Sequence, residues 1–171
     1  MDQRDLRQIF SAFATGVTVV TAFDSDGAPI GITANSFSSV SLDPPLLLWC
    51  LDNRSRHLPV FAQGRQFAVH ILSEGQEATA MQFARSGASG LQQKAASDTA
   101  PRVDGVLARI ECRVADLHVA GDHTVIIGEI DSAEIADAFP LVFQKSSFGR
   151  FVSNSELSGQ EAWHILVDMW S

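Results

Sequence analysis

The sequence predicts a mainly β protein: a closed or nearly closed antiparallel barrel with a few peripheral helices. Three observations predict this class. Short apolar runs, rich in β-branched residues, recur along the chain and are separated by turn residues. Helical periodicity is confined to short segments, and strands and helices do not alternate as they do in a parallel sheet. The chain also has no G-x-G-x-x-G run, which disfavours a Rossmann sheet.

Length and charge restrict the function classes. The chain has 171 residues, which suits one compact domain. Its 20 acidic and 12 basic residues give a formal net charge of −8, whereas nucleic acids and anionic membranes are normally bound by clustered basic residues. The longest apolar run, Leu46–Leu51, is far shorter than the roughly 20 residues of a membrane-spanning helix. Because the N-terminus lacks an apolar signal core, we expect a cytoplasmic protein without nucleic-acid or membrane partners.

The first third of the chain predicts a helix followed by a hairpin. An amphipathic helix is expected over residues 2–14, with Asp2 as its N-cap and Gly16 as its stop. Its apolar stripe consists of Leu6, Ile9, Phe10 and Phe13. Val17–Phe23 and Ile30–Ala34 are strand-like and are joined by a turn rich in Asp, Gly and Pro, so they predict a β-hairpin.

Further strands are expected at Leu46–Leu51, Phe67–Leu72, Val106–Val114, Val125–Ile135 and Leu141–Lys145. The first is entirely apolar and is expected to be buried on both faces, whereas Val106–Val114 alternates and is expected to be half exposed. Ser73 is expected to cap a short helix over residues 74–83, and residues 85–102 predict a surface excursion with at most one weak helix. The apolar tail, residues 163–170, must pack on its own barrel or on a second subunit.

Motifs for metal and nucleophilic catalysis are missing. The five histidines form neither H-x-H nor H-E-x-x-H, and Cys50 and Cys112 have no C-x-x-C partner, so we expect no metal site. Both cysteines lie singly in apolar runs and are expected to be reduced, buried thiols. Without a G-x-S-x-G elbow or a Walker loop, hydrolase and kinase functions have no local support.

Polar residues crowd into the run from Thr33 to Pro45, between two expected strands. Its small side chains let a ligand approach the backbone, and its hydroxyl and amide groups can converge on the edge of a flat heteroaromatic ring. The alternative is a connection whose Ser and Thr side chains satisfy their own backbone in local turns. Composition alone leaves both interpretations open.

Two further polar runs are candidates for ligand contacts. Asp52–His57 follows an apolar strand and offers two guanidiniums, a hydroxyl and an amide, which suit a phosphate group. The alternative there is a solvated loop with a helix N-cap at Asn53 or Ser55. In Gly121–Thr124, the imidazole of His123 either projects over a ligand at the barrel rim or belongs to an ordinary turn.

These three runs, in this order, resemble the short-chain flavin reductase family, which supplies the NAD(P)H-dependent reductase components of two-component flavin monooxygenases. The most specific evidence is a pair of motifs about 80 residues apart, N-S-F-x-S-V-S-L-x-P-P at Asn35–Pro45 and G-D-H-T at Gly121–Thr124. Other matching stretches are Ile9–Thr21, Gly31–Leu46, Phe67–Leu72, Gln82–Ala84, Gly105–Cys112 and Gly128–Glu129. The resemblance covers roughly residues 6–151. We therefore expect residues 1–171 to form a single flavin reductase-like domain, with a core at about 6–151 and a C-terminal tail at 152–171.

The resemblance implies an FMN-binding split β-barrel, antiparallel and Greek-key-like, that forms a homodimer with flavin near the subunit interface. It implies that the isoalloxazine ring is lined by Gly31, Ile32, Thr33, Ala34, Asn35, Ser36 and Ser38. It implies that the ribityl chain and phosphate are held by Cys50, Leu51, Asp52, Asn53, Ser55, Arg56 and His57, helped by Ala84 and Arg85. His123 would orient the nicotinamide, and the family's C-terminal pyridine-nucleotide stretch falls on Lys145, Ser146, Ser147 and Phe148.

The function implied by this resemblance is an NAD(P)H:flavin oxidoreductase that supplies reduced FMN or FAD to a separate oxygenase. FMN is favoured over FAD, and NADH or NADPH is the hydride donor. Two alternatives stay open: a split-barrel flavoprotein that reduces another acceptor, such as a cobalt corrinoid, and a non-catalytic flavin-binding protein. Hydride transfer belongs to the two cofactors, so we expect His123 to orient and polarise more than to transfer protons.

The sequence departs from the family pattern in two places. The stretch that is R-G-x-Y in the family has a serine, Ser146, where the family has glycine. The family's longer segment after F-A is shortened here to Ser86–Ala100. Both changes lie on the pyridine-nucleotide or partner side of the expected site, so they leave the choice between NADH and NADPH, and the electron acceptor, open.

Overall fold

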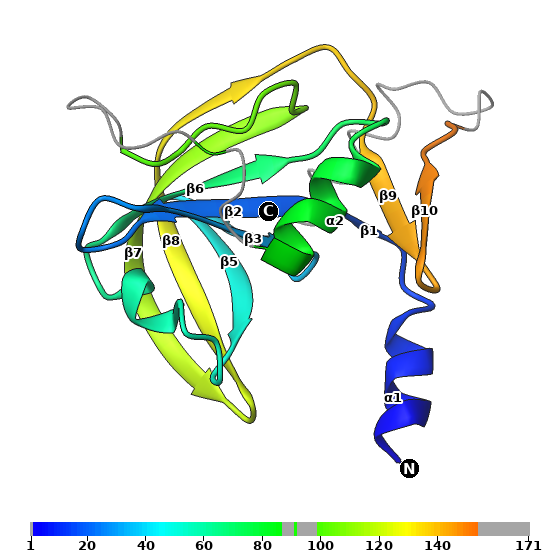
Figure 1. The fold of residues 1–171 in the computed structure, drawn as a ribbon, viewed down its shortest axis with the longest axis horizontal. Coiled ribbons are helices and arrows are strands. Elements are labelled where there is room, and N and C mark those ends of the chain that lie inside the picture. The colour runs from blue at the N-terminus through cyan, green and yellow to red at the C-terminus, as the bar shows by residue number, and fades with distance from the viewer. Residues whose placement is uncertain (1, 87–90, 92–98, 154–171) are drawn as a thin grey trace.

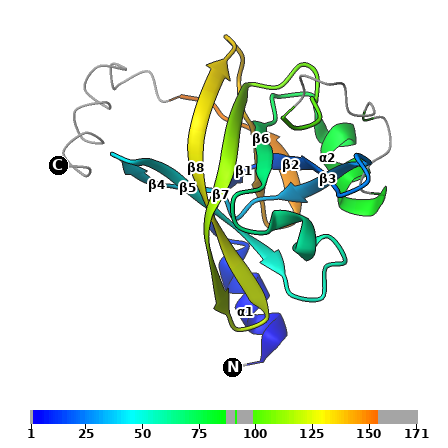
Figure 2. The same ribbon diagram turned by 90° about the vertical axis from the view of Figure 1, so that its left-hand side faces the viewer.

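The structure is a computed structural model and describes residues 2–86, 91 and 99–153. Its elements in chain order are α1 (Gln3–Phe10), β1 (Thr15–Gly16), β2 (Thr18–Phe23), β3 (Pro29–Ala34), β4 (Ser38–Leu42), β5 (Pro45–Asp52), the 3₁₀ helix η1 (Leu58–Phe61), β6 (Gln66–Ile71), α2 (Glu77–Ser86), β7 (Ala108–Ala120), β8 (His123–Ile135), β9 (Leu141–Gln144) and β10 (Ser147–Arg150). A seven-stranded sheet has the order β3-β2-β6-β7-β8-β5-β4, and a three-stranded sheet has the order β1-β9-β10 (Figure 1 and Figure 2).

The seven-stranded sheet curves around an apolar core. Val20, Trp49, Phe67 and Ile126, from four different strands, are fully buried there. Trp49 packs edge-on against Phe61, with their ring centroids 4.9 Å apart. The end strands β3 and β4 pair with β2 and β5 but not with each other, so hydrogen bonds do not close this sheet within the described residues. The predicted mainly β, antiparallel fold class is confirmed.

Helix α1 begins where predicted but ends earlier. The Asp2 carboxylate accepts a hydrogen bond from the Asp5 backbone, and the Asp5 side chain accepts one in return, so the expected cap is confirmed as a capping box. The expected stop at Gly16 is wrong, because the helix ends at Phe10 and Gly16 pairs with Val142 in the three-stranded sheet. The helix projects away from both sheets (Figure 1).

The hairpin of β2 and β3 is confirmed, but the expected burial of β5 on both faces is wrong. Leu47, Trp49 and Leu51 are buried in the core, whereas Leu48 and Cys50 between them are only half-buried. Successive side chains of a strand point to opposite faces, and only one face of β5 packs on this core. Cys50 is thus a half-buried thiol, while Cys112 is buried as expected.

Several further elements differ from the prediction: β1, β4 and β10 were not expected, β7 runs to Ala120 instead of ending at Val114, and α2 begins later. Strand β4 lies inside the polar run that was expected to be a connection, and its backbone pairs with β5. Strand β10 was not predicted either, and it pairs with β9. Helix α2 starts at Glu77 instead of residue 74, and Ser73 does not cap it because its hydroxyl donates to the Gly105 carbonyl at 2.6 Å. Neither described helix is long and apolar enough to cross a bilayer.

Residues 99–102 lie on the outer face of the seven-stranded sheet, where polar contacts fix them. The hydroxyl of Thr21, a fully buried residue, donates to the Pro101 carbonyl at 2.7 Å. The guanidinium of Arg109 contacts Glu111 and donates to the Ala100 carbonyl. Burial lowers the pKa of the nearby His70 to about 4, so this histidine is neutral at pH 7. Residues 87–90 and 92–98 of the predicted excursion, and the apolar tail, lie outside the described residues.

Gly128 lets strand β8 pass close to the core aromatic residues. A Cβ built on Gly128 would lie 2.6 Å from Cζ of Phe67 and 3.2 Å from Cβ of Cys112. Phe67 is completely buried, so it has little room to move. We expect Gly128→Ala to lower the free energy of unfolding by about 1–3 kcal/mol, as overpacked cores do, measured by urea denaturation.

Gly149 provides the matched control, because a Cβ added there would meet nothing within 4 Å and β10 lies outside this core. We expect Gly149→Ala to change the free energy of unfolding by less than about 0.5 kcal/mol. Equal stability of the two variants would contradict the close packing of Gly128 on Phe67.

Candidate active site

Three segments that are distant in the sequence meet at a small cavity of about 190 Å³. They are Gly31–Ile32 on β3, Ser55–His57 after β5, and Phe83–Arg85 near the end of α2. Arg56 and Arg85 are both exposed, and neither forms an ion pair with any described residue. Two guanidiniums that have no ion-pair partner in the part of the chain that the structure describes, beside a concave surface, suit an anion of the size of a phosphate.

In the loop that follows β5, the two arginines that the sequence singled out as phosphate ligands have different partners. The Arg54 guanidinium donates to both carboxylate oxygens of Asp52, at 3.1 and 2.8 Å, and these bonds hold the pKa of Asp52 well below its usual range. Arg56 instead donates from Nε to Nε2 of His57, at 3.2 Å. Burial and the Arg56 charge lower the pKa of His57, so its ring stays neutral and accepts this bond. Arg56 is therefore the cation that this loop can offer to a ligand.

Strands β7 and β8 are joined by a two-residue turn, Gly121-Asp122, that presents His123. The φ angle of Gly121 is 63°, a conformation that glycine adopts without steric cost. Nδ1 of His123 lies 2.7 Å from Oδ1 of Asp122, and this bond lowers the pKa of Asp122. Because the carboxylate is ionised and only accepts, Nδ1 carries the proton and Nε2 is left for a ligand. The His123 side chain is 45% exposed.

The loop that follows β5 and the Gly121-Asp122 turn that presents His123 are neighbours in space. Asp52, the last residue of β5, lies directly opposite His123 in the antiparallel ladder of β5 and β8. The adjacent Asn53 makes hydrogen bonds to the turn from both its backbone and its side chain. Two of the three polar runs singled out in the sequence therefore form one continuous surface at this end of the sheet.

A larger cavity, of about 630 Å³, lies beside the other polar run. Its lining residues are Phe13, Ala14, Thr15, Gly16, Thr18, Asn35, Ser36, Phe37, Ser38 and Ile71. The Ser36 hydroxyl accepts a hydrogen bond from the Cys50 backbone at 2.9 Å, and the Thr33 hydroxyl donates to the Ala80 carbonyl at 2.7 Å. These two hydroxyls thus have partners within the fold, whereas Asn35 is exposed at the cavity.

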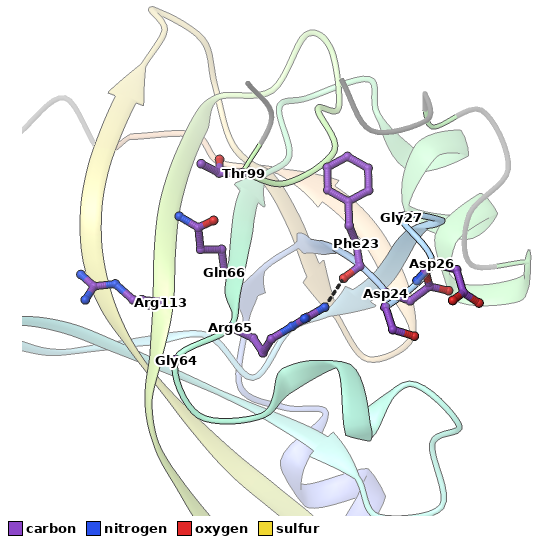
Figure 3. A pocket seen from close by; sticks show the side chains of 10 residues that line it. Phe23, Asp24, Asp26, Gly27, Gly64, Arg65, Gln66, Thr99 and Arg113 are labelled. Carbon is purple, nitrogen blue, oxygen red and sulfur yellow. Dashed lines mark hydrogen bonds between the residues drawn. The ribbon is translucent and has the colours of Figure 1, made fainter. Parts of the chain in front are cut away.

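A third cavity, of about 490 Å³, lies at the turn between β2 and β3 and includes none of the predicted site residues. Its two arginines do not converge: Figure 3 shows the Arg65 side chain reaching toward Phe23, while Arg113 points the other way. Arg65 donates to the Phe23 carbonyl at 3.2 Å, and Arg113 pairs with Asp131. This cavity therefore lacks two neighbouring cations without carboxylate partners such as Arg56 and Arg85 at the small cavity. The described residues contain no group of three or more potential metal ligands.

The family to which the chain belongs is decided by comparison with known proteins. A family model described as "Flavin reductase like domain" matches residues 10–151. The chain belongs to the flavin reductase-like family. The resemblance inferred from the two motifs is thereby confirmed.

Individual relatives agree with this assignment. The chain is 46% identical over 152 residues to the FMN reductase (NADH) of Agrobacterium fabrum, an alignment that covers 88% of this chain and 87% of the relative. It is 34% identical over 152 residues to the reductase subunit of a flavin-dependent monooxygenase from Rhodococcus jostii, covering 86% and 77% of the two chains. The structure of the Streptomyces globisporus NADH:FAD oxidoreductase in complex with NAD and FAD fragments matches with a TM-score of 0.80 and 37% identity, covering 90% of this chain and 95% of that one. The predicted flavin reductase function is confirmed at the level of the family.

In this flavin reductase-like chain, most of the expected flavin residues divide between the two cavities. Seven of them line the small cavity: Gly31, Ile32, Ser55, Arg56, His57, Ala84 and Arg85. Three line the large cavity: Asn35, Ser36 and Ser38. Thr33 and Ala34 lie between these groups on the chain, which spans about 10 Å from Ile32 to Asn35 at the rise of an extended strand. Cys50, Leu51, Asp52 and Asn53 line neither cavity; Leu51 is buried in the core.

The residues expected at the pyridine nucleotide do not meet within one flavin reductase-like chain. Lys145 and Ser146 form the turn between β9 and β10, with φ angles of 46° and 62°, and Ser147 begins β10. The Phe148 ring packs on Phe143, with centroids 5.2 Å apart. In Figure 1 this hairpin lies at the right of the molecule, apart from the β7–β8 turn at the bottom that presents His123.

Sequence reasoning missed two parts of the cavity walls. Phe13 to Gly16 line the large cavity, and Phe83 lines the small one. Phe13 was placed on the apolar stripe of a helix that in fact ends three residues earlier. Its position inside a stretch that matches the family was the available signal. Phe83 had the same signal, because it lies in the matching stretch Gln82–Ala84, and the packing of α2 beside β3 brings it to the small cavity.

Proposed function

We propose that this chain is an NADH-dependent flavin reductase that reduces FMN and supplies it to a separate oxygenase. The observation that carries the proposal is the meeting of three distant segments, with Arg56 and Arg85, at one small cavity. The names of its relatives support the reaction and the partner: one is named FMN reductase (NADH), and another is the reductase subunit of a flavin-dependent monooxygenase. Because a further relative is named an NADH-dependent FAD reductase, FAD is the second flavin to test.

The residues present fit a flavin nucleotide. Arg56 and Arg85 would bind its phosphate through charge-assisted hydrogen bonds. Beside Asn35 and Ser36 the chain offers a cavity of about 630 Å³, a volume typical of small-molecule sites. When both are bound, flavin and pyridine nucleotide themselves supply the chemistry of hydride transfer.

The chain's own residues then have binding and orienting roles. His123, held by Asp122 with Nε2 directed away from that bond, would accept a hydrogen bond from the carboxamide of the nicotinamide and fix its orientation. No side chain in this scheme transfers a proton. Residues 145–148 remain proposed contacts of the pyridine nucleotide, contributed from a separate part of the surface.

The proposed functional unit is a homodimer of single-domain chains. Phe10, Phe13 and Leu42 are 69%, 77% and 78% exposed, an unusual amount of apolar surface for one chain. The site proposal requires a dimer in which the β9–β10 hairpin of one chain lies near His123 of the other. Sedimentation equilibrium is expected to give twice the chain mass, and a monomer at micromolar concentration would contradict the dimer.

Anaerobic mixing of the protein with FMN and NADH tests the proposed function. We expect the visible absorption band of FMN to bleach rapidly, with NADH consumed in equal amount, and the same assay with FAD, riboflavin and NADPH ranks the alternatives. Flavin that binds but stays oxidised would indicate a non-catalytic binding protein. NADH consumption that requires a corrinoid acceptor would indicate the other alternative.

A further inference from the structure

Asn53 is bound to both residues of the turn that presents His123, and to Thr124 just after it. Its backbone N–H donates to the Asp122 carbonyl at 2.9 Å, and its Nδ2 donates to the Gly121 carbonyl at 3.2 Å. Its Oδ1 accepts a hydrogen bond from Oγ1 of Thr124 at 2.7 Å. We call Asn53 and Thr124, with the bonds between them and the turn, the Asn53–Thr124 clamp.

The clamp is anchored on a rigid part of the fold. Thr124 is only 4% exposed and pairs with Leu51 in the β5–β8 ladder, one position beyond the pairing of His123 with Asp52. Because both ends of the Asn53 amide are already hydrogen-bonded, the Asn53 side chain is committed to the turn. The neighbouring Arg56 instead faces the small cavity. The loop therefore has one part that meets the cavity and another that holds the turn.

We propose that Asn53 and Thr124 are positioning residues: they hold the His123 turn in register with the loop that would bind the flavin phosphate. This inference rests on the proposed function and adds a coupling between the two halves of the site. The residues on either side of His123 are fixed by the clamp, so the backbone that carries the imidazole cannot shift relative to the cavity. A displacement of about 1 Å in an orienting group is enough to weaken a hydrogen bond and misalign reacting rings.

The decisive variant is Thr124→Val, which keeps the shape of the side chain and removes the hydroxyl that bonds Asn53. We expect the KM for NADH to rise about fivefold to tenfold, the effect of one lost hydrogen bond, with a much smaller change in the Kd for FMN. Thr124→Ser keeps the hydroxyl and is expected to restore the KM. The matched control is Thr21→Val, which removes a buried hydroxyl bond of the same 2.7 Å length on the outer face of the sheet. That variant should lose similar stability in thermal unfolding without changing the KM.

A double-variant cycle tests whether Thr124 acts through His123. In a His123→Ala background, Thr124→Val should raise the KM for NADH no further; an equal rise in both backgrounds would overturn the inference. If Thr124→Val does not fold, Asn53→Ala, which truncates an exposed side chain, takes its place in the cycle.

A measurement that does not depend on activity tests the clamp separately from the proposed function. Long-range ¹H–¹⁵N NMR reports the tautomer of each histidine, and His123→Ala identifies the His123 signal by its loss. We expect the Nδ1–H tautomer in the wild-type protein and in Thr124→Ser, and a mixture of tautomers in Thr124→Val. An unchanged tautomer together with an unchanged KM would overturn the clamp and leave the reductase proposal standing. A wild-type protein that does not oxidise NADH with flavin would instead overturn the proposed function.

Discussion

Replacing His123 with alanine is expected to raise the KM for NADH about fivefold to tenfold while the affinity for FMN changes little. In the structure Nδ1 of His123 is bonded to Asp122, which leaves Nε2 outside that bond, at the end of the β5–β8 ladder. One hydrogen bond to the nicotinamide carboxamide contributes roughly 1–1.5 kcal/mol, and about 1.4 kcal/mol corresponds to a factor of ten. Steady-state kinetics with varied NADH at saturating FMN measures this effect, and fluorescence quenching measures the Kd for FMN.

His118→Ala is the matched control for this experiment. His118 lies in the same β7–β8 hairpin, is 58% exposed in its side chain, and pairs with Asp116 at 3.1 Å. It lines neither candidate cavity, so we expect wild-type kinetics from this variant. Unaltered NADH kinetics in His123→Ala would remove His123 from the site, whereas a large fall in kcat with the KM unchanged would assign it a role in the chemical step.

Replacing Ser55 and Arg56 together with alanine is expected to weaken FMN binding by about tenfold to a hundredfold for each charge-assisted bond that is lost. Hydrogen bonds to charged groups contribute roughly 1.5–3 kcal/mol each. Arg56 provides the available cation of its loop, because Arg54 is held by Asp52. Fluorescence quenching gives the Kd. The loss should be larger for FMN than for riboflavin, which has no phosphate.

Arg102→Ala removes the same positive charge from the outer face of the sheet, where Arg102 pairs with Glu134 at 2.8 Å. We expect this control to leave FMN binding unchanged. Raising the salt concentration should weaken the binding of FMN to the wild-type protein, because exposed charges are screened. An identical Kd for FMN in the wild-type protein and the Ser55→Ala, Arg56→Ala variant would place the phosphate elsewhere.

Features that depend on near neighbours in the chain were predictable. The cap of α1 involves Asp2 and Asp5, three residues apart. The turn between β2 and β3 is closed by Asp24, whose carboxylate accepts from the backbones of Asp26 and Ala28. In both cases the side chain that directs the backbone is adjacent to it, so composition and spacing were sufficient.

Features that depend on pairing partners were not predictable. Strand β4 has a polar composition, and only its register with β5 makes it a strand. Helix α2 begins later than expected: the Ser73 hydroxyl donates to the carbonyl of Gly105, more than 30 residues away, and the Ser73 backbone donates to the side chain of Gln76 just before the helix. The different roles of Arg54 and Arg56 likewise depend on the structure, in which Asp52 binds the Arg54 guanidinium and leaves that of Arg56 free of it.

The sequence by itself determined the family, the mainly β class and the three polar runs, because motif residues and apolar periodicity are properties of the chain order. Only the tertiary structure decided that the loop after β5 lies against the His123 turn, that Arg56 and Arg85 share a cavity, and that the β9–β10 hairpin lies apart from that turn. The physical reason is the range of the interactions. Caps and turns act within a few residues, whereas ladders and cavities join residues tens of positions apart, and many registers satisfy the same local pattern.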